Sequence, residues 1–212
     1  MQISAKAVKE LRGKTGAGIM DCKDALTAVD GDVDKAVVWL REKGLRTYEA
    51  KASRAASEGV VTSYIHAGGK IGVLVEINCE TDFVARTEVF QELCHQIAMH
   101  VAAASPQYVS RDDVPEDALD RERSILQAQA ETEGKPAHIA EKIVEGRMRK
   151  FYEEQCLLEQ PYIRDEDHNV ESIIKDAVAK LGERIAVRRF ARYVLGQDSN
   201  VAETSPSAAD AS

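Results

Sequence analysis

The chain has 212 residues, of which 44% are hydrophobic and 30% are charged, and its formal net charge is −8. No run of apolar residues approaches the roughly 18 that suggest a transmembrane helix, and the N-terminus lacks the apolar core of a secretory signal. The four cysteines are scattered without CxxC pairs or nearby histidine clusters, so we expect free thiols in a cytoplasmic protein, with no disulfide framework and no metal site.

The negative charge is unevenly distributed along the chain. Residues 1–54 carry 11 Lys and Arg against 8 Asp and Glu, whereas the remainder carries 17 against 28. An acidic body argues against general nucleic-acid binding. We therefore expect no nucleic-acid partner.

Residues 1–54 are predicted to form a first domain of three short helices. Ser4 can cap the first helix, and a glycine-bearing break over residues 13–18 precedes the second. Asp32 can cap the third helix, which is expected to end near Gly44.

Two large apolar residues, Ile19 and Met20, are adjacent at the start of the second helix, so both cannot point into the same core. The simpler interpretation is a loosely packed methionine. The alternative is an apolar contact patch that is rimmed by Arg12 and Lys23.

Residues 55–197 are predicted to form an α+β core with a small antiparallel sheet that is packed by helices. Two strands flank the Gly68-Gly69 pair, which favours a tight hairpin. Alternation in the second strand places one apolar set on one face: Ile71, Val73, Val75, Ile77 and Cys79.

Helical periodicity and turn residues organise the rest of the core. A linker that is part helical is expected over 48–57, a turn over 165–169 and a disordered tail over 198–212. Helices are predicted from Thr87, over about 115–133 and 139–154 and over 173–181, and a last strand is predicted over 185–195.

Between the second strand and the following helix lies the turn Thr81-Asp82-Phe83-Val84. Side chains at such corners tend to project away from the scaffold. The simpler interpretation is that Thr81 caps a short helix and Phe83 enters the core, since phenylalanine is usually buried. The alternative is that Asp82 and Phe83 project outward.

Four sequence motifs resemble those of the bacterial elongation factor Ts (EF-Ts) family in the family order. They are LRGKTGAGIMDCKDAL over 11–26, SYIHAGGKIG over 63–72, EINCETDFVAR over 76–86 and KLGERIAVRR over 180–189. The resemblance covers roughly residues 3–196. It implies a guanine nucleotide exchange factor for elongation factor Tu (EF-Tu), with no catalytic chemistry of its own and no cofactor.

The resemblance also implies which residues bind EF-Tu. Arg12, Ile19, Met20 and Lys23 would lie in a ubiquitin-associated-like domain that grips the nucleotide-binding domain of EF-Tu. Thr81, Asp82, Phe83 and Val84 would enter near its Mg²⁺ and phosphate site, and His66, Leu181 and Gly182 would complete the footprint.

Long members of this family duplicate the core and add a coiled coil. This chain holds one copy of each core element, with no heptad run long enough for that insertion. In long members the hairpin with His66 and the turn with Asp82-Phe83 lie on separate copies of the core. A short chain could restore both contacts only by pairing with a second copy of itself. We therefore expect a homodimer and a two-plus-two complex with EF-Tu, with an exposed face of strand 185–195 or its neighbouring helices as the dimer surface.

Two alternatives come from other functional classes. Arg188, Arg189 and Arg192, interleaved with aromatic residues, suit a ribosome- or RNA-associated adaptor, although the simpler interpretation is that they pair with the acidic body. An enzyme built on His66 and Asp82 would need a pocket that joins them, and no spacing rule supports it.

Overall fold

A computed structural model describes residues 3–133, 136–197 and 200–203. The chain divides into two compact units, each assembled from separate segments. The first unit consists of Met1–Val60, Asn78–Leu93 and Ser172–Ala186, and the second consists of Val61–Ile77, Cys94–Glu171 and Val187–Ser212. The domain boundaries that we expect at residues 54 and 197 stay predictions.

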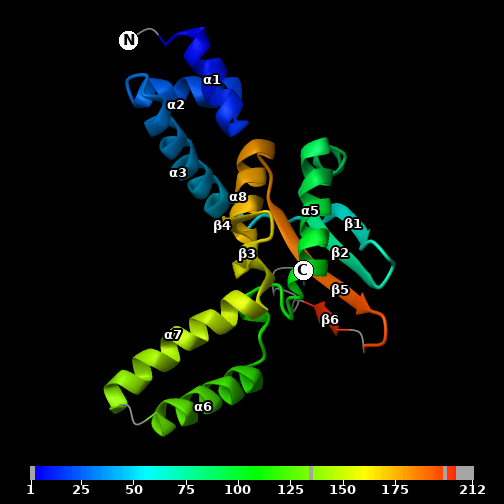
Figure 1. Ribbon diagram of the computed structural model, residues 1–212. Coiled ribbons are helices and arrows are strands. Elements are labelled where there is room, and N and C mark those ends of the chain that lie inside the picture. The colour runs from blue at the N-terminus through cyan, green and yellow to red at the C-terminus, as the bar shows by residue number, and fades with distance from the viewer. Residues whose placement is uncertain (1–2, 134–135, 198–199, 204–212) are drawn as a thin grey trace. The chain divides into compact units, whose positions relative to one another are not determined.

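Three helices form the N-terminal part of the first unit: α1 (Ala5–Thr15), α2 (Ile19–Ala28) and α3 (Val33–Lys51) (Figure 1). The Ser4 hydroxyl accepts a hydrogen bond from the Ala7 amide, and the Asp32 carboxylate accepts two at the start of α3. A fully buried cluster joins the helices: Leu11, Cys22, Ala25, Leu26 and Ala36. This arrangement fits the expected ubiquitin-associated-like domain.

The prediction that α3 ends near Gly44 is wrong, because the helix continues to Lys51. Gly44 is buried, and a Cβ atom placed on it would lie 3.3 Å from the Cβ atom of Ala179 in α8 (Val170–Leu181). Figure 1 shows α3 beside α8. This glycine therefore allows two helices to approach closely instead of ending one.

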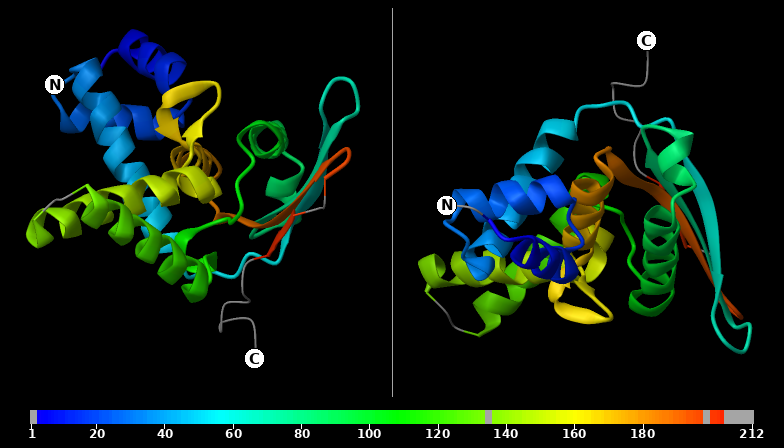
Figure 2. Two further views of the ribbon diagram at one scale, coloured as in Figure 1. Left: turned by 60° about the horizontal axis from the view of Figure 1, so that its bottom comes forward. Right: turned by 90° about the horizontal axis from the view of Figure 1, so that it is seen from above.

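A four-stranded sheet has the order β1-β2-β5-β6 and is built from β1 (Glu58–Ile65), β2 (Ile71–Cys79), β5 (Ile185–Val194) and β6 (Asn200–Glu203). The predicted inner face of β2 is confirmed, since Val73, Val75, Ile77 and Cys79 are all buried. Helix α5 (Glu88–Ala104) lies over one face of the sheet, whereas Figure 2 shows no described helix over the other.

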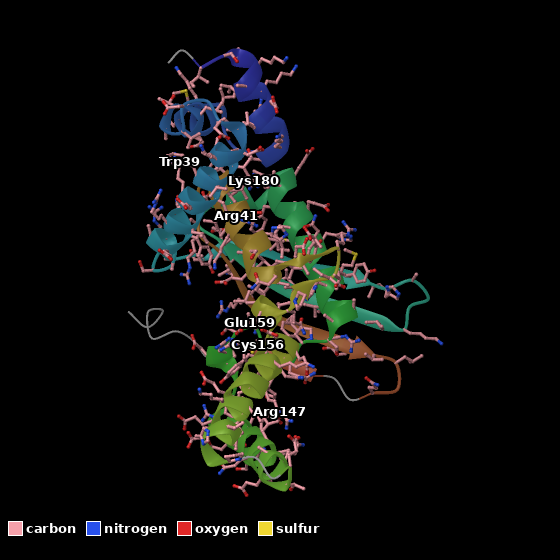
Figure 3. The ribbon with its side chains drawn as sticks, turned by 60° about the vertical axis from the view of Figure 1, so that its left-hand side comes forward. Trp39, Arg41, Arg147, Cys156, Glu159 and Lys180 are labelled. Atoms are coloured by element: carbon pink, nitrogen blue, oxygen red, sulfur yellow. The ribbon has the colours of Figure 1, made fainter. Side chains whose placement is uncertain are left out.

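Helices α6 (Glu116–Thr132) and α7 (Ala137–Gln155) pack against each other in the second unit. The Arg147 guanidinium, labelled on α7 in Figure 3, donates to Gln129 at 3.1 Å and to Glu133 at 2.9 Å. The sequence showed no heptad run long enough for a coiled coil, yet a hairpin of paired helices forms without one.

Short elements join the helical pair to the rest of the second unit. They are two 3-10 turns, Arg111–Asp113 and Leu157–Glu159, and a small sheet of β3 (Pro161–Tyr162) and β4 (Asp165–Asn169). The prediction of a turn over 165–169 is therefore wrong. Antiparallel pairing with β3 holds these polar residues in an extended form, and tertiary pairing of this kind overrides weak local preference.

All four cysteines are buried and free, as expected. Within the predicted disordered tail, residues 200–203 form β6 antiparallel to β5, and residues 198–199 and 204–212 lie outside the described residues. No described helix is both long enough and apolar enough to cross a membrane.

Candidate protein-binding site

The turn after β2 carries an aromatic ring that faces away from its own unit. It forms α4 (Asp82–Ala85), a single helical turn whose Val84 and Ala85 are buried. Phe83 is 78% exposed. Thr81 does cap this helix, since its hydroxyl accepts a hydrogen bond from the Val84 amide at 3.4 Å. The simpler interpretation is therefore right about the cap and wrong about the ring.

The Asp82 carboxylate lies beside Phe83 and is partly exposed. It accepts a hydrogen bond of 2.7 Å from the guanidinium of Arg86, one turn further along the chain. The Arg86 side chain is 77% exposed and that of Asp82 is 46% exposed, so this ion pair is weak and a stronger cation can displace Arg86. Asp82 can therefore act as an accessible negative charge next to the ring.

A carboxylate from a distant segment holds Thr81 in place. Glu183 accepts two hydrogen bonds from Thr81, one from its hydroxyl at 2.7 Å and one from its backbone amide at 3.0 Å. Burial, and secondly the charge of Glu183, raises the pKa of the neighbouring Cys79 thiol above its usual value. Cys79 is therefore a neutral, inert thiol beneath the turn.

A second carboxylate, that of Glu80, connects the turn to the segment that contains Glu183. Glu80 accepts a hydrogen bond of 2.7 Å from the Arg184 backbone amide and forms an ion pair of 3.3 Å with Arg54. The amide of Arg184, followed by the side chain of Arg54, holds the pKa of Glu80 below its usual value. Glu80 therefore stays ionised at neutral pH.

The Leu181-Gly182 pair ends α8 in the same unit. Gly182 has a left-handed φ of 74°, and its amide donates to the Val178 carbonyl at 2.9 Å. The Lys51 ammonium donates to the carbonyl of Gly182. Leu181 is half-buried and Gly182 is exposed, so this helix end is open to a partner.

The N-terminal candidate residues lie in α1 and in the first half of α2. Ile19 is 57% exposed and Met20 is 65% exposed, so both residues, and not one alone, face solvent. Lys23, one turn further along α2, and Arg12, in the second half of α1, are also exposed. The exposure of Ile19 and Met20 is consistent with the expected apolar contact patch, and its role in binding stays a prediction.

His66 belongs to the second unit, unlike the other candidates. It lies at the β1–β2 hairpin, where it is exposed and its Nδ1 atom is 3.1 Å from the Tyr64 hydroxyl. The structure therefore gathers all candidates for EF-Tu binding except His66 in the first unit.

The arginines of β5 make contacts within the second unit. Arg188 and Arg189 lie 3.4 Å and 2.8 Å from the carboxylate of Glu76. Arg192 donates to the Ala102 carbonyl at 3.1 and 3.2 Å. These contacts agree with the simpler interpretation of this strand, so no observation here favours an RNA-binding adaptor.

Comparison with known proteins decides the family. The family model described as Elongation factor TS matches residues 20–197. The chain belongs to the elongation factor Ts family. It is 58% identical over 195 residues to a protein from Moorella thermoacetica that is named Elongation factor Ts, and the match covers 92% of this chain and 96% of that one.

Two further relatives carry the same name. The protein from Desulforamulus reducens is 59% identical over 196 residues, with 92% of this chain and 90% of the relative covered. That from Geobacter sulfurreducens is 57% identical over 197 residues, with 93% and 91% covered. The family supports a role as a translation elongation factor, of the kind that exchanges nucleotide on another protein.

The residues that support the turn were not found from the sequence. Glu183 and Thr81 are separated by 102 positions, and Glu80 and Arg184 by 104. No local pattern connects such pairs. The one available signal was the position of Glu183 directly after the Leu181-Gly182 pair.

Proposed function

We propose that this chain is a guanine nucleotide exchange factor that binds EF-Tu·GDP and promotes release of GDP. In this proposal the Asp82-Phe83 turn inserts near the Mg²⁺ and phosphate site of EF-Tu. The observation that carries the proposal is the 78% exposure of Phe83 on a turn whose next two residues are buried. Large aromatic side chains that remain exposed on a rigid support are typical of binding sites.

The energy available from this ring fits the task in part. A factor that prefers the nucleotide-free form of EF-Tu weakens nucleotide binding by the same ratio, because linkage is reciprocal. Each tenfold weakening takes about 1.4 kcal/mol. Burial of a phenylalanine side chain contributes about 1.5–3 kcal/mol, which corresponds to roughly 10- to 150-fold. A larger effect requires the other contacts.

The remaining candidates have distinct parts in the proposal. Asp82 brings a negative charge close to the Mg²⁺ site and disturbs its ligand network. Ile19 and Met20, with Arg12 and Lys23, anchor EF-Tu so that the turn arrives in register. His66 and the Leu181-Gly182 pair complete the footprint, and no cofactor or metal of the chain's own takes part.

We also propose that the chain works as a homodimer in a two-plus-two complex with EF-Tu. Support comes from the open face of the sheet in the second unit, where three apolar residues are exposed: Val61 at 68%, Ile65 at 65% and Leu74 at 46%. Large apolar side chains that are exposed on one face of a sheet are a common feature of protein interfaces.

The test is the release of fluorescent GDP from purified EF-Tu, with and without this protein. We expect the unmodified chain to accelerate release. Phe83→Ala should reduce the acceleration by at least about tenfold, because the ring supplies on the order of 1.5–3 kcal/mol.

A matched control is Val38→Ala, which truncates another exposed apolar residue of the first unit (58% exposed) outside the proposed footprint. It should leave release unchanged. Both variants should melt at the temperature of the unmodified chain, since neither residue is buried. Equal activity of Phe83→Ala and the unmodified chain would refute the proposal.

A further inference from the structure

The segment before Asp82 and the segment after Gly182 are joined by hydrogen bonds in both directions, because each contributes a carboxylate that accepts from the other. Glu183, directly after Gly182, receives two hydrogen bonds from Thr81, directly before Asp82. Glu80, in the first segment, accepts a hydrogen bond from the backbone amide of Arg184, in the second. Each carboxylate thus accepts a hydrogen bond from a backbone amide of the opposite segment. Hydrogen bonds to ionised groups are among the stronger ones.

The hydroxyl of Thr81 lies in the middle of a short chain of hydrogen bonds. It donates to Glu183 at 2.7 Å and accepts from the amide of Val84 at 3.4 Å. The donation to Glu183 leaves the oxygen lone pairs directed at the amide, so one carboxylate fixes both the rotamer of the cap and the start of α4. Phe83 lies on that single helical turn, so its direction follows from the cap.

The contacts of Glu80 and Arg184 also involve a third segment, which follows α3. Glu80 pairs with Arg54, and the Arg184 guanidinium donates to the backbone carbonyl of Arg54. The ion pair and hydrogen bonds therefore connect the segment after α3, the corner before α4 and the segment after α8. All of these residues belong to the first compact unit.

We propose that Glu183 is a positioning residue for nucleotide exchange. It holds the Thr81 cap so that Phe83 is presented in a fixed direction relative to the Leu181-Gly182 end of α8. Glu183 does not itself touch EF-Tu or the nucleotide. The inference rests on the proposed function, because it assigns the orientation of the ring that this function uses.

The experiment measures stimulated GDP release over a range of factor concentrations for four proteins: the unmodified chain, Glu183→Ala, Phe83→Ala and the double variant. Glu183→Ala should lower the maximal rate by about tenfold, as expected for a misdirected contact group. The half-saturating concentration should change by less than about threefold, since the N-terminal patch is intact. In the Phe83→Ala background, Glu183→Ala should have less than about a twofold effect, because coupled residues are not additive.

Two further variants separate positioning from general damage. Glu183→Gln keeps one acceptor oxygen for the Thr81 amide and should fall between the unmodified chain and Glu183→Ala. Asp176→Ala removes an exposed carboxylate of α8, the helix that ends just before Glu183, and should behave as the unmodified chain. In the free protein, amide hydrogen exchange at Thr81 and Val84 should be faster in Glu183→Ala. This measurement detects the loss of the hydrogen bonds between Thr81 and Glu183 without any activity assay.

Each outcome has a definite meaning. Slow release with Phe83→Ala and normal release with Glu183→Ala would overturn the positioning role and leave the proposed function standing. An equal loss from Glu183→Ala in both backgrounds would also overturn it, since the residue would then act independently of the ring. Normal release with Phe83→Ala would overturn both.

Discussion

Phe83 and Val84 are neighbours in the chain, yet one is 78% exposed and the other is buried. The difference follows from a helix of a single turn, in which adjacent side chains point about 100° apart. The sequence indicated the corner and the capping residue correctly. It could not give the direction of the ring, because four residues have no usable periodicity and the rotation is set by Glu183, which lies 102 positions from the capping residue Thr81.

A pair of glycines, Gly182 and Gly146, tests the backbone conformation at the end of α8. Gly182 has a φ of 74°, whereas Gly146 lies inside helix α7, and a Cβ atom at either position would meet nothing within 4 Å. Gly182→Ala should lower the free energy of unfolding by about 1–2 kcal/mol, because the left-handed conformation is strained for alanine. Gly146→Ala should raise it by up to about 1 kcal/mol through helix propensity.

Urea unfolding of the two variants checks this prediction. Opposite signs are required, since neither added methyl group meets a neighbour. A stabilised Gly182→Ala would show that the end of α8 is not left-handed in solution.

At the scale of elements, the sequence predicted most helices and strands but not how their ends pack. The helices of residues 1–54 and the inner face of β2 followed from capping residues and periodicity. The end of α3 did not, because Gly44 serves contact with Ala179 instead of chain termination. The strand Asp165–Asn169 was missed because its five polar residues carry no apolar alternation.

A buried polar network links α5 to the segment that follows α7 in the second unit. His100 is fully buried, and its Nε2 atom lies 3.0 Å from the Gln160 side-chain oxygen. Its Nδ1 atom accepts from the amide of Ile163 at 3.4 Å, which places the ring proton on Nε2. Gln160 in turn donates to the Glu154 carbonyl at 2.7 Å. The contacts of α5 with the end of α7 and with the turn after β3 therefore depend on a neutral imidazole.

This network predicts a pH dependence of stability. Burial lowers the pKa of His100 below its ordinary value of 6.5, although its bond to Gln160 opposes the shift. The unfolded chain therefore binds a proton at a higher pH than the folded chain does. The contribution of His100 to stability is complete above about pH 6.5 and is lost as the pH falls below that value.

Urea unfolding between pH 7.5 and 5.0 measures the effect. We expect the unmodified chain to lose stability over this range and His100→Gln, which has no titrating group there, to lose less. His95→Gln, which removes an exposed histidine from the same helix, should retain the full pH dependence. Identical slopes for His100→Gln and the unmodified chain would exclude His100 as the cause.

At the scale of the whole molecule, the open face of the sheet predicts self-association. Val61 and Ile65 expose more than 60% of their surface on the same face of β1, with Ser63 between them. Light scattering should therefore give a dimer at micromolar concentration. Ile65→Glu should shift the chain toward monomer, because it places like charges opposite each other across the interface.

The control for this prediction is Ile125→Glu, which adds the same charge at a residue of α6 that is 52% exposed. It should leave the dimer intact. A monomer of the unmodified chain over the whole concentration range would remove the proposed two-plus-two complex. A dimer that survives Ile65→Glu but not Ile125→Glu would move the interface to the helical pair.

The shortness of α4 has a consequence for inhibitor design. A helix of four residues lies far below the length at which isolated helices persist in water, so a linear synthetic peptide with the sequence of residues 76–86 would populate a broad ensemble of conformers. Such a peptide would have to be ordered at the moment of binding, at a cost in affinity. A useful mimic would need a covalent ring closure that replaces the bond from Thr81 to Glu183.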